Sequence, residues 1–317
     1  MKRCLYCYQP LGENEKDFHA TCSRKIFSQS TPPKLSLKEE QVKEWATRVI
    51  QSQIAVTGVQ PKLSMNIVSG ENKVEPKQFT IVGLWGNYIL KPPTPQYPQL
   101  PEVEDLTMHL ASIANINTVP HSLIRLETGN LAYLTKRIDR AKKVKLHMED
   151  MCQLTERLTE DKYHGSYEQI AKTLLKYSAN PGLDTVNFFE QVLFSFLTGN
   201  ADMHLKNFSL IKQPTTGYVL SPTYDMVATA LVNPADEEDL ALTLNGKKKK
   251  IKFDDFTAAF NSLNLEVKQQ ENIFKKMMNA KIKWFNFIDT SFLSNDFKSS
   301  FKVLIEERFK RLTKNDQ

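Results

Sequence analysis

Short apolar runs bounded by Gly, Pro and Asn predict a strand-rich region between about residues 60 and 140. These runs cover residues 62–69, 78–82, 88–91 and 131–135. One helix is predicted to interrupt them, because apolar residues recur there at spacings of three and four. The residues of that stripe are Val103, Leu106, Leu110 and Ile113.

After about residue 145 the pattern becomes helical. A helix capped by Asp184 is predicted to end at Gly199-Asn200, because Gly is the residue that most often terminates a helix. Its apolar stripe comprises Val186, Phe189, Val192, Leu193, Phe196 and Leu197. A second stripe near the end of the chain comprises Phe297, Phe301, Leu304, Ile305, Phe309 and Leu312. Residues 209–211 and 218–220 have the pattern of two short strands between these helices.

This order of elements predicts a two-lobed α+β protein. Residues 28–37 are polar and contain Pro, which is typical of a linker, and a short helix is predicted from Glu39 to Ile50. The predicted domains are residues 1–30, a strand-rich lobe at 31–145 and a helical lobe at 146–317.

Composition is that of an ordinary globular protein. Of the 317 residues 41% are apolar, and the net charge is +6, so disorder as the main state is excluded. There is no run of 18 apolar residues and no apolar segment behind the first basic residues, so we expect a cytoplasmic protein without a membrane span. A pI near 8.9 permits a polyanionic partner without requiring one.

Three of the four cysteines lie in the first 22 residues. Cys4-x2-Cys7 and His19-x2-Cys22 form two ligand pairs, which is the pattern of a tetrahedral zinc site. A redox CxxC motif and chance clustering are the alternatives, but a redox motif does not need the second pair. We therefore predict a zinc knuckle with a structural role. Cys152 stands alone and is predicted to be a small buried residue.

The chemistry-bearing pattern is Asp202-x4-Asn207 followed by Asp225. Phosphoryl transfer requires an Asp beside the acceptor hydroxyl, an Asn and a second Asp for magnesium, and a Lys for the phosphates. The Asp-x4-Asn spacing equals that of the protein-kinase catalytic loop. A polar turn accounts for either Asp alone, but not for the whole set. Lys91 ends an apolar run and is by itself either solvated or a phosphate ligand.

At these positions the chain resembles the HipA family of bacterial Ser/Thr protein kinases, the toxins of toxin–antitoxin systems. The resemblance covers roughly residues 50–250 and is strongest to the HipT branch of three-gene systems. The elements that carry it are residues 57–62, 88–91, 101–104, 135–140, 149–153, 202–207 and 224–225.

The resemblance implies a two-lobed protein-kinase-like fold that uses ATP and magnesium. It assigns Asp202 as the catalytic base and Asn207 and Asp225 as magnesium ligands, and it suggests that Glu104 pairs with Lys91. The remaining nucleotide-binding positions are Thr57, Gly58, Val59, Gln60, Lys62, Lys91, Lys136, Arg137, Ile138, Gln153, His204, Lys206 and Tyr224.

The phosphate loop departs from the family pattern, in which Ser-x-Ser-Gly or Ser-x-Ala-Gly is common. Here the residues are Ala55-Val56-Thr57-Gly58, so Thr57 becomes the candidate for autophosphorylation. The sequence leaves open whether Ala55 is natural.

The resemblance also implies partners. They are an aminoacyl-tRNA synthetase as protein substrate, a small HipS-like antitoxin, and a HipB-like DNA-binding protein. No membrane and no direct nucleic-acid contact are expected. Two alternatives stay open: a kinase-fold enzyme that acts on a lipid or small molecule, and a catalytically idle nucleic-acid-binding regulator.

Overall fold

The structure is a computed structural model, which describes residues 2–35, 61–69, 77–82, 85–141 and 144–313. The chain divides into two compact units. Unit 1 comprises Met1–Asp105, Val119–Ile138 and Thr290–Phe292, and unit 2 comprises Leu106–Thr118, Asp139–Asp289 and Leu293–Gln317. The three domains predicted from the sequence stay a prediction.

Unit 1 is built on a five-stranded antiparallel sheet with strand order β2-β1-β3-β5-β4. Its strands are β1 Leu63–Val68, β2 Gln78–Ile81, β3 Tyr88–Lys91, β4 His121–Arg125 and β5 Leu131–Lys136. The four runs read from the sequence are confirmed as β1, β2, β3 and β5. The remaining strand, β4, begins with the polar His121 and Ser122 and ends with Arg125, which hides its apolar centre from a pattern search.

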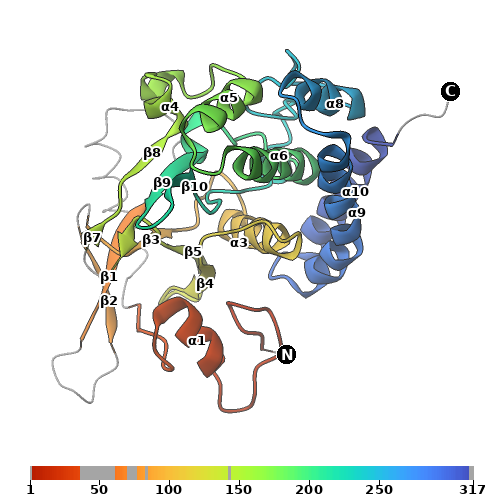
Figure 1. Cartoon of the computed structure of the whole chain (residues 1–317). Coiled ribbons are helices and arrows are strands. Elements are labelled where there is room, and N and C mark those ends of the chain that lie inside the picture. Colours follow the sequence, from red (N-terminus) through yellow and green to blue (C-terminus); the bar gives the residue numbers. More distant parts are fainter. Residues whose placement is uncertain (1, 36–60, 70–76, 83–84, 142–143, 314–317) are drawn as a thin grey trace. The chain divides into compact units, whose positions relative to one another are not determined.

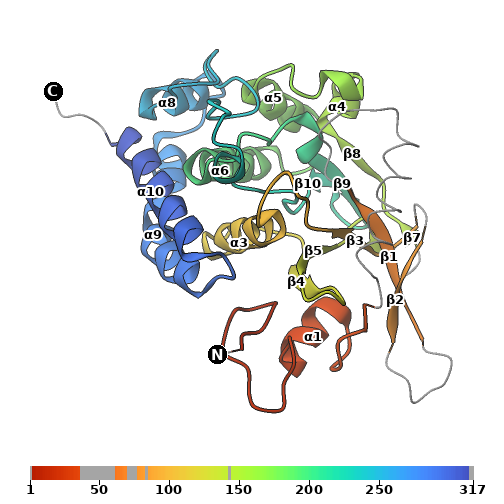
Figure 2. The same ribbon diagram turned by 180° about the vertical axis from the view of Figure 1, so that it is seen from behind.

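An N-terminal segment with the short helix α1, Ala20–Phe27, packs at the β4 edge of this sheet (Figures 1 and 2). The backbone N–H of Leu123 in β4 donates to the Leu5 carbonyl at 3.2 Å. The Tyr88 hydroxyl of β3 donates to the Ile26 carbonyl of α1 at 3.1 Å. Backbone and side-chain contacts therefore both attach this segment to the sheet.

Helix α3, Leu100–Ile113, begins in unit 1 and continues into unit 2, with the division after Asp105. Three residues of its predicted apolar stripe, Val103, Leu106 and Leu110, are fully buried, and the fourth, Ile113, is half-buried.

Unit 2 combines a small antiparallel sheet, of strand order β10-β9-β8, with most of the helices. Its strands are β6 Arg140–Ala141, β7 Val144–Lys145, β8 Met148–Asp150, β9 Ser209–Gln213 and β10 Gly217–Leu220. Its helices are α4 Met151–Leu154, η1 Thr159–Asp161, α5 Tyr167–Tyr177, α6 Pro181–Thr198, η2 Leu205–Asn207, α7 Thr229–Val232, α8 Phe253–Ser262, α9 Val267–Thr290 and α10 Asn295–Arg311.

Helix α6 lies at the centre of unit 2 and packs against α5 and α10 (Figure 1). Phe188, Phe189, Phe194 and Phe196 are fully buried along it. Most of its circumference is therefore covered, as in a helix at the centre of a core.

The prediction that Asp184 caps α6 is wrong. The helix begins at Pro181, a residue favoured in the first turn because it needs no N–H partner there. Asp184 instead lies buried in that first turn, where its carboxylate accepts from the Ser178 hydroxyl at 2.5 Å and the Leu220 N–H at 2.8 Å. It joins α6 to β10.

Two sequence expectations fall outside the described residues. They are the helix from Glu39 to Ile50 and the phosphate-loop residues Thr57 to Gln60. Cys152 is buried, as expected. Among the described residues, no helix has both the length and the apolar character that a membrane crossing needs.

Candidate kinase active site and cysteine cluster

The loop that carries Asp202 and Asn207 begins at a sharp helix end. Gly199 adopts a left-handed conformation at φ +67°, and a Cβ there would lie 2.8 Å from Leu304 Cδ2 and 3.0 Å from Ala230 Cβ. The Asn200 N–H returns to the Ser195 carbonyl at 2.8 Å, which closes the last turn of α6. Both the φ angle and the close neighbours favour glycine at this position.

Backbone hydrogen bonds fix the path of this loop. The Ala201 N–H donates to Thr229 Oγ1 at 2.8 Å, and the Asp202 N–H donates to Asn200 Oδ1 at 3.1 Å. The Leu205 N–H reaches the Lys162 carbonyl at 3.1 Å. Because partners come from α7, from the loop itself and from the segment before α5, the loop is held on several sides.

Asp202 is half-buried and accepts a hydrogen bond from the Tyr163 hydroxyl, with 2.5 Å between the oxygens. Burial and the charge of Asp202 together raise the pKa of Tyr163 well above its ordinary value. The phenol therefore stays protonated and acts as the donor. Sequence reasoning missed Tyr163, because it lies 39 residues before Asp202 and belongs to no motif.

His204 is buried two residues after Asp202, and its ring meets the Tyr163 ring edge-on at 4.9 Å between centroids. Burial lowers the pKa of His204 to about 4, against the opposing effects of Asp202 and Asp225. The ring is thus neutral near pH 7. Among the described residues its Nδ1 has no hydrogen-bond partner, which is unusual for a buried nitrogen.

Lys206 and Asn207 follow in the short helix η2. Lys206 Nζ donates to Asp150 Oδ2 at 2.6 Å, and Asn207 is buried with its Nδ2 3.8 Å from Met203 Sδ. Asp150 caps helix α4 and exchanges hydrogen bonds with Gln153, whose side chain accepts from the Asp150 N–H at 2.9 Å. The two predicted nucleotide-binding residues Lys206 and Gln153 are therefore both attached to Asp150.

Tyr224 and Asp225 come after β10. The Tyr224 hydroxyl lies 2.5 Å from Ser209 Oγ and donates to the Lys206 carbonyl at 3.1 Å, so it braces η2 against β9. Asp225 has a left-handed backbone at φ +56°, an uncommon conformation for a residue with a side chain. Its neighbour Tyr224 bonds the Lys206 carbonyl, which attaches this segment to η2, and the role of Asp225 as a magnesium ligand stays a prediction.

The remaining predicted nucleotide-binding positions within the described residues lie in unit 1. Lys91 is 3% exposed, and its Nζ lies 2.5 Å from Oε1 of Glu104, which is 1% exposed. The suggested Lys91–Glu104 pair is thus present, and the solvated alternative for Lys91 is wrong. Lys136 and Arg137 pair through their backbone N–H groups with Pro120 and Asn87, Ile138 ends this segment, and Lys62 is exposed.

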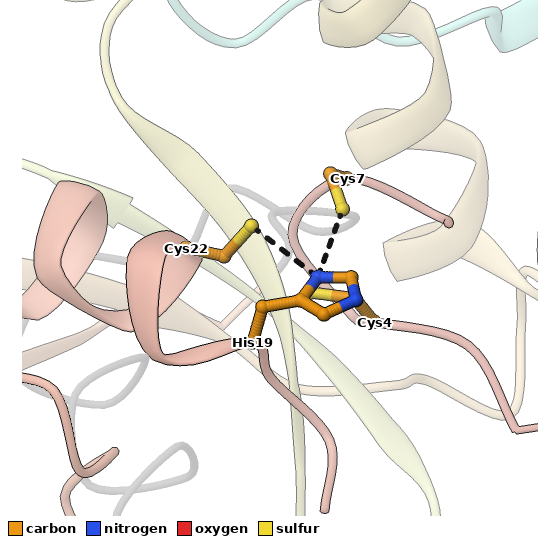
Figure 3. Close-up of side chains that lie close together, drawn as sticks. All are labelled: Cys4, Cys7, His19 and Cys22. Carbon is orange, nitrogen blue, oxygen red and sulfur yellow. Dashed lines mark hydrogen bonds between the residues drawn. The ribbon is translucent and has the colours of Figure 1, made fainter. Parts of the chain in front are cut away.

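Four potential zinc ligands converge in the N-terminal segment (Figure 3). The ligand atoms of Cys4, Cys7, His19 and Cys22 all lie within 4.8 Å of one another. His19 Nδ1 is 3.4 Å from Cys7 Sγ and 3.7 Å from Cys22 Sγ.

The ring orientation of His19 suits a metal ligand. Its Nε2 lies 3.0 Å from the Pro10 carbonyl, which accepts a hydrogen bond from it. In the neutral ring Nδ1 is then unprotonated, and this nitrogen faces the sulfurs. Zinc bonds of about 2.0–2.3 Å place tetrahedral ligands about 3.3–3.8 Å apart. The distances from His19 Nδ1 to Cys7 Sγ and Cys22 Sγ, 3.4 Å and 3.7 Å, lie in this range. Three sulfurs and one nitrogen therefore fit one zinc ion with modest adjustment.

Comparison with known proteins identifies the family. Residues 54–285 match the HipA-like C-terminal domain, so the chain belongs to the HipA-like family. It is 30% identical over 253 residues to a putative kinase of Haemophilus influenzae, covering 73% of this chain and 69% of that protein. It is 26% identical over 214 residues to the serine/threonine-protein kinase toxin HipA of Shewanella oneidensis, covering 61% of this chain and 47% of that protein.

Solved structures show the same fold. HipA of Shewanella oneidensis MR-1, solved in complex with HipB and operator DNA, matches with a TM-score of 0.67 at 22% identity, over 84% of this chain and 70% of that one. The Helicobacter pylori proinflammatory kinase CtkA matches with a TM-score of 0.56 at 15% identity, over 79% and 93%. The fold is therefore a mixed α/β kinase-like fold.

Proposed function

We propose that this protein is an ATP-dependent Ser/Thr protein kinase and the toxin of a toxin–antitoxin system. The observation that carries the proposal is the loop after α6, where a fixed backbone presents Asp202 and, five residues later, Asn207. The curated relatives named as kinases support the same conclusion.

In this proposal Asp202 accepts the proton of the acceptor hydroxyl. Its carboxylate already accepts the Tyr163 hydroxyl at 2.5 Å, so it is able to bind a hydroxyl donor in the required way. His204 beside it is neutral and does not compete for that proton near pH 7. Such a site works by positioning and electrostatics, without a covalent intermediate.

The residue types in each unit suit ATP and magnesium. In unit 2, Asn207 and Asp225 supply amide and carboxylate oxygens, the ligands that magnesium prefers. In unit 1, Lys91 supplies a cation that is paired with Glu104. The buried Nδ1 of His204, without a partner among the described residues, agrees with a group that binds beside it. When bound, magnesium would neutralise phosphate charge; Lys136 to Ile138 would hold adenine, and Thr57 to Lys62 would cover the phosphates.

The test is transfer of radiolabelled γ-phosphate from ATP to bacterial lysate protein, with wild type and Asp202→Asn. We expect transfer to fall at least about 10²-fold in the variant, the size typical for loss of a general base, while nucleotide binding remains. Equal transfer by both proteins would refute the assignment.

The substrate and the partners are also proposals, and they come from the resemblance to the family. We propose an aminoacyl-tRNA synthetase as substrate, to be identified by phosphoproteomics after expression of wild type and Asp202→Asn. A HipB-like antitoxin is proposed because the similar Shewanella HipA was solved with HipB. A HipS-like partner and phosphorylation of Thr57 stay predictions from the resemblance; co-purification and mass spectrometry, respectively, test them.

The cysteine cluster is proposed as a structural zinc knuckle. Four protein ligands fill a tetrahedral site and leave no open position for chemistry.

A further inference from the structure

A network of buried side chains connects the cysteine cluster to the Lys91–Glu104 pair, and all of it lies within unit 1. Tyr8, one residue after Cys7, is 1% exposed, and its hydroxyl donates to Oδ2 of Asp105 at 2.7 Å. Oδ1 of the same carboxylate lies 2.6 Å from His121 Nδ1 in β4. Asp105 itself is fully buried and is the neighbour of Glu104 in helix α3.

Two adjacent buried carboxylates therefore attach the start of α3 to different elements. Glu104 reaches Lys91 in β3, and Asp105 reaches Tyr8 and His121. Successive residues of an α-helix project about 100° apart, so two such attachments fix the rotation of the helix as well as its position. A buried carboxylate without a partner is strongly unfavourable, which makes each attachment specific.

The aromatic ring of Tyr133 contacts residues at both ends of this network. His121 stacks on Tyr133 in β5, with 6.0 Å between ring centroids and 28° between planes. Lys91 Nζ lies 5.4 Å from the centroid of the same Tyr133 ring, and the two residues are register partners of β3 and β5. The lysine that would meet ATP and the residues that hold Asp105 thus share one neighbour.

The backbone of the cysteine cluster places Tyr8 at this point. The Tyr8 N–H donates to the Cys4 carbonyl at 2.9 Å, and the Cys4 N–H donates to the Gln9 carbonyl at 2.9 Å, which makes a tight turn around Cys7. Tyr8 has φ +63°, a left-handed conformation that favours glycine and is retained in other residues where the surroundings require it. The turn that carries two cysteines of the cluster therefore also directs a tyrosine hydroxyl to α3.

We propose that Tyr8 and Asp105 are positioning residues: through them the N-terminal cysteine cluster sets helix α3 and thereby holds Glu104 against Lys91. The cluster then has a role in phosphate binding, beyond local structural support. This inference rests on the proposed function, because it concerns the lysine that would meet ATP.

The experiment uses the full chain and a double-mutant cycle. Tyr8→Phe removes one hydroxyl, and Tyr88→Phe is the matched control. Tyr88 is also buried, and its hydroxyl bonds the N-terminal segment at the Ile26 carbonyl instead of Asp105. Each is made in wild type and in Glu104→Gln. The readouts are the dissociation constant of magnesium–ATP, kcat and KM for phosphate transfer, zinc content, and amide hydrogen exchange of α3 without nucleotide.

We expect Tyr8→Phe to weaken magnesium–ATP binding about fivefold. This is less than the full effect of one lost hydrogen bond to a charged group, because the bond acts on Lys91 only through α3. It should speed amide exchange at the start of α3 while zinc content stays unchanged. In the Glu104→Gln background the Tyr8→Phe effect on ATP binding should disappear, whereas any effect of Tyr88→Phe should remain the same in both backgrounds. If Tyr8→Phe fails to fold, Asp105→Asn gives the same comparison.

The inference is overturned if Tyr8→Phe and Tyr88→Phe act alike, or if the Tyr8→Phe effect persists undiminished in Glu104→Gln. Failure of the proposed function would give a different experimental result. Wild type would then bind no magnesium–ATP, while amide exchange of α3 would still report whether Tyr8 positions the helix.

Discussion

The Tyr163 hydroxyl donates to Oδ1 of Asp202 across 2.5 Å, so the proposed base already has a hydroxyl bound to it. Tyr163 is 38% exposed, so its ring lies partly at the surface beside Asp202. In the proposed function the phenol orients the carboxylate through Oδ1, and Oδ2 would accept from the hydroxyl of the substrate.

We predict that Tyr163→Phe lowers kcat for phosphate transfer about three- to tenfold and leaves KM for ATP unchanged. The reason is that Tyr163 holds Asp202 and has no proposed contact with nucleotide. Steady-state kinetics at varied ATP checks this. A rise in kcat would show instead that the phenol competes with the acceptor hydroxyl.

Substitution of the two aspartates, Asp202 and Asp225, should affect magnesium–ATP binding differently. We predict that Asp225→Asn weakens magnesium–ATP binding at least about tenfold, because a charged metal ligand is lost, whereas Asp202→Asn leaves that binding within about twofold. Calorimetric titration with magnesium–ATP distinguishes them. Similar losses in both variants would contradict the separate roles.

The cysteine cluster should hold one zinc ion per chain. We predict that Cys4→Ser loses the zinc and increases proteolysis within the first thirty residues, while the helices of unit 2 keep their melting transition. Metal analysis of protein purified without chelators measures the zinc, and limited proteolysis locates the change. Cys152→Ser is the control, because Cys152 lies outside the cluster; zinc loss there, or wild type without zinc, would count against the knuckle.

Asp239 attaches helix α10 to the rest of unit 2. It is buried, accepts hydrogen bonds from Arg308 and Arg311, and accepts from the Ile251 N–H at 2.9 Å. Burial works to raise the pKa of Asp239, but the two arginines outweigh it and hold the pKa below the ordinary 3.8. We predict that Asp239→Asn lowers the free energy of unfolding at pH 7 by about 3 kcal/mol, since two cations lose their partner.

The pH dependence of this effect has a definite sign. Because the folded-state pKa is lowered, the contribution of Asp239 is complete above pH 3.8 and is lost as the pH falls through the folded-state value. Urea unfolding of wild type and Asp239→Asn should therefore converge below pH 3.8. The control is Asp289→Asn, whose pair with Lys302 is exposed and should contribute less than about 1 kcal/mol.

Local patterns in the sequence predicted much of this molecule. Strand β3 at residues 88–91 and the end of α6 at Gly199 were found because their signals lie within a few neighbouring residues. Tyr163 and Tyr8 were missed because their partners, Asp202 and Asp105, lie 39 and 97 residues away. Tertiary packing brings these pairs together, and a single tyrosine in a sequence carries no sign of its partner.

Unit 1 includes residues 290–292 from late in the chain. Arg3 Nη1 donates to the Thr290 carbonyl at 2.7 Å, and the Phe292 ring packs edge-on against Tyr8 at 4.9 Å between centroids. During synthesis, domains generally fold in the order in which they leave the ribosome. Here the N-terminal strands of unit 1 are translated long before residue 292, so until then the nascent chain lacks Phe292, a ring neighbour of Tyr8. In the proposed kinase, unit 1, which contains Lys91, would therefore be complete only after residue 292 has been translated.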